Sequence, residues 1–71
     1  MANLTTAANA ACSTAFGAAV QNAFAQLENR LIAAQSDQDR SDSIASFEAA
    51  LKFAGDAFNI SQTSVPKVFG A

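Results

Sequence analysis

The sequence predicts an all-α fold, a two-helix antiparallel hairpin that assembles into a helical homopolymer. Three observations predict the hairpin: two segments carry apolar side chains at helical spacing, a polar segment separates them, and no proline occurs before Pro66. A chain of 71 residues forms one small domain at most. We divide it into a helix over about residues 15–35, a polar turn over 36–42, a second helix over about 43–62 and an irregular C-terminal tail.

The first predicted helix is rich in Ala, Leu, Gln and Glu, which favour helices. Its larger apolar side chains recur at spacings of four, three and four and therefore share one stripe: Val20, Phe24, Leu27 and Leu31. Gly17 weakens the helix by about 1 kcal/mol relative to alanine, or lets another backbone approach closely. Upstream, we expect residues 3–14, which contain Thr and Asn, to form a weaker helix that frays or stays extended.

The predicted turn lies in the sequence QSDQDRSDS, Gln35–Ser43, which is polar throughout. Its Ser and Asp side chains compete for backbone hydrogen bonds and so favour a break between helices. We expect Ser41 or Asp42 to cap the second helix, where Asp42 also complements the helix dipole. The aspartates are spaced like part of a calcium loop, but the glycine and glutamate that an EF-hand needs are missing, which favours a solvated turn.

The second predicted helix carries the clearest pattern of the chain. Its seam residues step by three, four, three and four positions: Ile44, Phe47, Leu51, Ala54 and Phe58. We predict that the larger of these side chains form the hairpin core: Ile44, Phe47, Leu51 and Phe58. The regular helix is expected to end between Ile60 and Ser64, because Ser and Thr are poor helix formers and the residue before Pro66 avoids helical angles.

The composition offers no enzymatic chemistry. The chain has no histidine and one cysteine, so we predict no catalytic residue, no cofactor, no metal site and no internal disulfide. Cys12 is interpreted as a small buried apolar residue, with an intersubunit disulfide as the alternative. The four basic residues are scattered and the net charge is −2, which disfavours a nucleic-acid partner.

The N-terminal segment Ala2–Leu27 contains no charged side chain. Polar residues interrupt it, so no stable membrane span is expected, and it lacks the regions of a secretory signal. If the protein leaves the cell, we expect export without a cleaved signal peptide. We interpret the missing charge as burial between copies of the chain, because desolvating unpaired charges there would cost several kcal/mol each. The alternative is an Ala-rich terminus that is exposed to water.

A two-helix hairpin of this length has a marginal core of its own. A chain of this size buries only about 60% of its unfolded surface, and each buried alanine methyl contributes only about 0.8 kcal/mol. Without a disulfide or a metal, oligomerisation remains as a source of stability. We predict that eight apolar side chains contact neighbouring subunits: Phe16, Val20, Phe24, Leu27, Leu31, Phe53, Ile60 and Phe69.

The layout of the chain resembles the subunits of type III secretion needles and Hrp-type pili. The resemblance rests on a charge-poor start, the turn QSDQDRSD and the run FEAALKFAGDAFNISQTSVPKVFGA, Phe47–Ala71. It implies a small helical hairpin that is exported to the cell surface and polymerises around a narrow channel for unfolded proteins. It also implies that the C-terminal helix lines the lumen, with Asn59, Gln62 and Lys67 as lumen candidates.

The sequence and this resemblance together predict a structural subunit of an extracellular filament that forms a protein-export conduit. Its partners would be other copies of the chain and the exported unfolded proteins. Two alternatives stay open: a coat or decoration protein of a phage, assembled by similar packing, and a secreted membrane-active helical peptide. The peptide alternative lacks the Lys/Arg-rich face that surface-active helices usually carry.

Overall fold

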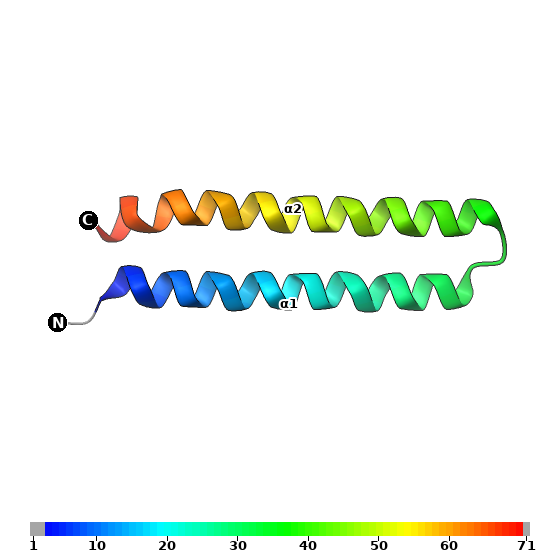
Figure 1. Cartoon of the computed structure of the whole chain (residues 1–71), viewed down its shortest axis with the longest axis horizontal. Helices are drawn as coiled ribbons and strands as arrows, with labels where there is room; N and C mark the ends of the chain where they lie inside the picture. Colours follow the sequence, from blue (N-terminus) through cyan, green and yellow to red (C-terminus); the bar gives the residue numbers. More distant parts are fainter. Residues whose placement is uncertain (1–2, 71) are drawn as a thin grey trace.

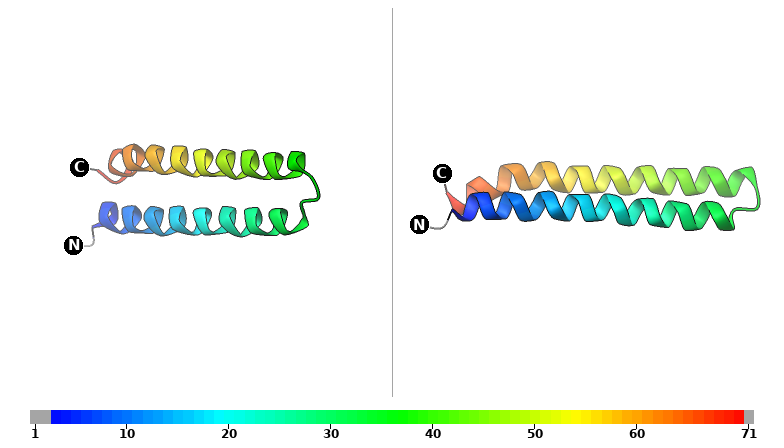
Figure 2. Two further views of the ribbon diagram at one scale, coloured as in Figure 1. Left: turned by 45° about the vertical axis from the view of Figure 1, so that its right-hand side comes forward. Right: turned by 60° about the horizontal axis from the view of Figure 1, so that its bottom comes forward.

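The computed structural model describes residues 3–70 and contains two long helices, α1 (Leu4–Ala33) and α2 (Asp37–Phe69). The helices run in opposite directions and form a rod of 56 × 16 × 8 Å, with the start of α1 and the end of α2 at the same end of the rod (Figure 1). They remain side by side in the two turned views (Figure 2). The predicted all-α fold with two packed helices is therefore confirmed, and assembly into a polymer stays a prediction.

α1 begins well before the predicted start at residue 15, and it ends at Ala33 rather than at residue 35. Asn3 caps it, because the Asn3 side-chain oxygen accepts a hydrogen bond from the Thr6 backbone N–H at 3.1 Å. The many alanines that follow favour the helix and outweigh the weaker propensities of Thr and Asn. The segment before residue 15 is therefore regular helix and not extended chain.

The turn between the helices is shorter than predicted. Only residues 34–36 lie between the helices, and α2 starts at Asp37, inside the predicted turn 36–42. Neither Ser41 nor Asp42 caps α2, because both lie within the helix. The short connection brings the two antiparallel helices together directly after the turn.

Ser36 provides the cap of α2. Its hydroxyl oxygen accepts a hydrogen bond from the Asp39 backbone N–H at 3.1 Å, and the Asp39 carboxylate accepts one from the Gln35 N–H at 3.1 Å. Asp37 and Asp39 lie in the first turn, where negative charge complements the helix dipole. The Asp-rich segment therefore starts a helix, whereas its composition alone predicted a break.

We expect Ser36→Ala to lower the free energy of unfolding by about 1 kcal/mol, because it removes the oxygen that pairs with an N–H at the start of α2. Ser41→Ala is the matched control, since Ser41 is exposed inside the helix, where alanine is at least as favourable. Urea unfolding followed by circular dichroism measures both variants. Equal losses in the two variants would contradict the position of the cap.

α2 continues through Pro66 to Phe69, so the predicted end between Ile60 and Ser64 and the predicted irregular tail are wrong. Proline removes one backbone donor, the one that would pair with the carbonyl of Gln62. Gln62 is an exposed residue, which lowers the cost of leaving its carbonyl without a partner inside the helix. The local preference against helix is therefore outweighed by the contacts of this segment.

These contacts join the end of α2 to the start of α1. Val65 is 8% exposed and is one of the two buried apolar residues of the described chain. The Gly70 N–H donates to the Pro66 carbonyl at 3.0 Å, and Gly70 has a φ of 89° that ends the helix. The Thr5 hydroxyl donates to the Gly70 carbonyl at 3.3 Å, so the two ends of the described chain touch.

The interior of the hairpin is thin. Among residues 3–70, Ala23 and Val65 are the buried apolar residues, and no large side chain is fully buried. The chain exposes 5216 Å², whereas a compact protein of 7.3 kDa exposes about 4,200 Å². It therefore buries only about half of its unfolded surface, compared with about 60% for a typical small domain.

Candidate functional site

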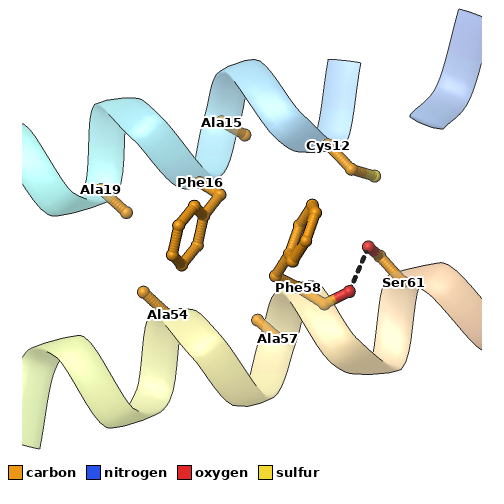
Figure 3. A pocket seen from close by; sticks show the side chains of 8 residues that line it. All are labelled: Cys12, Ala15, Phe16, Ala19, Ala54, Ala57, Phe58 and Ser61. Atoms are coloured by element: carbon orange, nitrogen blue, oxygen red, sulfur yellow. Dashed lines mark hydrogen bonds between the residues drawn. The ribbon is translucent and has the colours of Figure 1, made fainter. Parts of the chain in front are cut away.

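An apolar groove lies between the helices in the half of the rod that contains the chain ends (Figure 3). Its volume is about 300 Å³, and eight side chains line it, none of them charged: Cys12, Ala15, Phe16, Ala19, Ala54, Ala57, Phe58 and Ser61. Half of these residues are alanines, whose methyl groups leave space that larger side chains would fill. The groove therefore follows from the alanine content of the two helices.

An aromatic pair joins the helices at the groove. The ring centroids of Phe16 and Phe58 are 5.1 Å apart, and their planes make an angle of 35°, a tilted arrangement typical of favourable aromatic pairs. Both side chains are half-buried. The Ser61 hydroxyl donates to the Phe58 carbonyl at 2.6 Å, so its proton is already used within α2.

Cys12 borders two hollows. One is the apolar groove, and the other is a more polar hollow of about 350 Å³ that is lined by Asn9, Cys12, Ser13, Phe58, Ser61 and Gln62. The thiol is free and the residue is half-buried. The sequence predicted a small buried apolar residue, but Cys12 is only half-buried and one of its two hollows is lined largely by polar residues. An intersubunit disulfide stays a prediction.

Titratable side chains do not gather into a site in the described part of the chain. No three His, Cys, Asp or Glu side chains there come close enough to hold a metal ion. Asp39 and Asp42 accept hydrogen bonds from the backbone of Gln35 and the side chain of Gln38. These two exposed aspartates thus organise the turn and the first part of α2.

The predicted hairpin core needs one correction. Three of the four predicted side chains are half-buried along the seam: Phe47, Leu51 and Phe58. Ile44 is 43% exposed, so its assignment to the core is wrong, and Ser43 lies in the seam instead at 3% exposed. The Ser43 hydroxyl donates to the Asp39 carbonyl at 2.8 Å, which satisfies its donor and lets this small residue be buried.

The predicted subunit-contact residues fall into two groups. Four are half-buried and stabilise the hairpin itself: Phe16, Val20, Leu27 and Leu31. The other four keep between 48% and 71% of their surface exposed: Phe24, Phe53, Ile60 and Phe69. Only the second group offers large apolar side chains to another molecule. Contact with a neighbouring subunit stays a prediction for both groups.

Two edges border the apolar groove. Phe53, Ala57 and Ile60 are spaced i, i+4 and i+7 and therefore share one stripe of α2, and Ala57 itself lines the groove. We call this stripe the α2 rim. Ala15 and Ala19, spaced i and i+4, line the groove from α1 and form the alanine wall. One edge thus carries large exposed side chains, and the other carries only methyl groups.

The lumen candidates all lie on α2 and are exposed: Asn59, Gln62 and Lys67. Because α2 is continuous through Pro66, Asn59, Thr63 and Lys67 are spaced i, i+4 and i+8 on one polar stripe. An irregular tail would not have aligned Lys67 with Asn59. The structure therefore places two of the three lumen candidates, Asn59 and Lys67, on one stripe with Thr63, and Gln62 lies outside this stripe.

The groove was not part of the sequence-based expectations, nor was the burial of Ala23 and Val65. Alanine spacing is the signal that points to the groove, because Ala15 and Ala19 lie one turn apart and flank Phe16. Small side chains at this spacing leave space beside an aromatic ring. No comparable local signal marks Val65, which precedes a proline.

The sequence matches no protein-family model, and neither a curated protein nor a solved structure is significantly similar to it. Neither of the two described helices contains a stretch that is long and apolar enough to cross a membrane. The arguments for a function therefore come from the shape and the surface of the hairpin.

Proposed function

We propose that the chain is a structural subunit of an extracellular helical filament that forms a protein-export conduit, a type III secretion needle or a pilus. The main observation in support of this proposal is the thin interior of the hairpin. The hairpin exposes 5216 Å², and no large side chain of its described residues is fully buried. Such a molecule gains stability when other copies cover its surface, since binding that favours the folded state stabilises it.

The mechanism is geometric and involves no chemistry in the subunit. Identical hairpins form a filament when a contact repeats between different surfaces and the rotation does not close a ring. The uncharged part of α1, residues 4–27, is buried between copies, and the lumen candidates Asn59, Gln62 and Lys67 of α2 coat the channel. A polar surface with little charge lets unfolded proteins pass without binding them tightly.

Negative-stain electron microscopy of the purified protein at rising concentration tests this proposal. We expect unbranched filaments of uniform width. Closed shells would instead support a coat protein, and leakage of liposomes without filaments would support a membrane-active peptide. A compact single molecule that persists at millimolar concentration in sedimentation runs would contradict the proposal.

A further inference from the structure

We propose that the apolar groove binds the α2 rim of a second copy, so that two copies pair reciprocally through one face. This inference rests on the self-association in the proposed function and names the surface that performs it. It also goes beyond the proposed function, because single hairpins can form a filament without first forming a closed pair.

The groove and the rim fit in size and in chemistry. The groove measures about 300 Å³, and an apolar cavity of ~150 Å³ is enough to hold a benzene ring. Phe53 and Ile60 of the rim are 71% and 65% exposed and stand one on each side of Ala57 along the stripe. The alanine wall opposite, Ala15 and Ala19, lets another helix approach closely.

Charge favours a second copy at this face. The groove has no charged lining residue, and its α1 side belongs to the segment Ala2–Leu27, which has no charge at all. A partner with a charged docking face would lose hydration there without gaining an ion pair. The three rim residues of another copy are themselves uncharged, and the nearby Asp56 borders the rim on the side away from the groove, where its carboxylate stays in water.

The surface area also matches a pair. The chain exposes about 1,000 Å² more than a compact protein of its size. A stable complex of standard size buries about 800 Å² on each partner. One contact of this size therefore covers an area comparable to the extra surface that the chain exposes.

Reciprocity follows from the position of the rim. Because the α2 rim borders the groove, a two-fold arrangement that places one rim in the partner's groove also places the partner's rim in the first groove. A contact of the same patch with itself is isologous and closes at two copies. Phe24 and Phe69, exposed by 56% and 48%, remain for any contact that extends the assembly.

Cys12 provides a native reporter, because it lines the groove and its thiol is free. A small thiol reagent such as N-ethylmaleimide is applied to the unmodified protein over a range of concentrations, and the labelling rate is measured by mass spectrometry. We expect the rate to fall by about tenfold at concentrations well above the dissociation constant of the pair, because only the unpaired fraction reacts. Sedimentation measures the association in parallel.

Phe53→Ser and Ile60→Ser test the rim, and Ile32→Ser is the matched control. Ile32 is 80% exposed but lies in α1 near the turn, away from the groove. We expect each rim variant to weaken pairing by about tenfold or more, as central contact residues do, and the control to pair normally. Circular dichroism confirms that each variant keeps its helices.

The outcomes separate this inference from the proposed function. Filaments in which Cys12 stays fully reactive and the rim variants assemble normally would overturn the inference and leave the filament intact. Protected Cys12 in pairs that never form filaments would support the inference and overturn the proposed function. A rate of Cys12 labelling that does not change with concentration, together with a monomer in sedimentation, would overturn both.

Discussion

Phe58→Asp is expected to abolish the helical circular dichroism signal of the chain in dilute solution. Phe58 pairs with Phe16 at 5.1 Å between ring centroids and is half-buried in the seam. Removing a buried phenylalanine costs about 3–5 kcal/mol in a full core, and a carboxylate in the seam adds a desolvation cost. A domain of this length has a total stability of only about 4–10 kcal/mol, and a thin interior places this hairpin at the low end.

Phe53→Asp is the matched control for Phe58→Asp. It introduces the same charge into the same helix, but Phe53 is 71% exposed and does not lie in the seam. We expect this variant to keep its helical signal and its cooperative unfolding, and to lose the protection of Cys12 that pairing provides. If Phe53→Asp unfolded the chain while Phe58→Asp left it folded, the assignment of seam and rim would be wrong.

The double variant Gly17→Ala/Gly55→Ala is expected to raise the free energy of unfolding by about 2 kcal/mol, about 1 kcal/mol for each site. Both glycines lie inside helices, and a methyl group at either position would meet no atom within 4 Å. Alanine therefore gains helix propensity and reduces the freedom of the unfolded chain without a clash.

Gly70→Ala is the control for this prediction. An added methyl group would also find open space there, but Gly70 has a φ of 89°, which alanine adopts only with strain. We expect no gain, or a loss of about 1–3 kcal/mol, in thermal and urea unfolding, because residues other than glycine rarely adopt this conformation. A stabilisation by Gly70→Ala equal to that of the helical glycines would contradict the conformation of this cap. A loss in the double variant would mean that the two helices are closer at these sites than the structure has them.

Helical periodicity predicted two packed helices and most of their seam, although Phe24 and Ile44 of the predicted stripes are exposed. Val20, Leu27 and Leu31 recur at helical spacing in α1, and all three lie half-buried along the seam. Phe47 and Leu51 do the same in α2. The signal is strong because large apolar side chains have to avoid water on the same side of each helix.

The element boundaries were wrong because caps and distant contacts decide them. The side chain of Ser36 pairs with the backbone of Asp39 and moves the start of α2 into the predicted turn. At the other end, the burial of Val65 and the contact between Thr5 and Gly70 join residues far apart in the sequence. The helix preferences of Pro66 and its sequence neighbours contain no information about these distant contacts, so they predict that the helix ends too early.

Only part of the candidate site could be predicted from the sequence, for a related reason. A stripe of large residues placed Ile44 in the core, but the seam of α2 runs one position earlier there, through Ser43. A small side chain is favoured where two helices approach closely, and a scale of hydrophobicity does not rank serine as a core residue. The groove likewise depends on which alanines face each other across the hairpin, which requires the pairing of the two helices.

The antiparallel arrangement has a practical consequence for labelling. Residues 3 and 70 lie at the same pole of a rod 56 Å long, and the turn at residues 34–36 lies at the opposite pole (Figure 1). Labels attached at residues 3 and 70 therefore mark the same pole, and a dye that is to mark the opposite pole has to be attached in the turn.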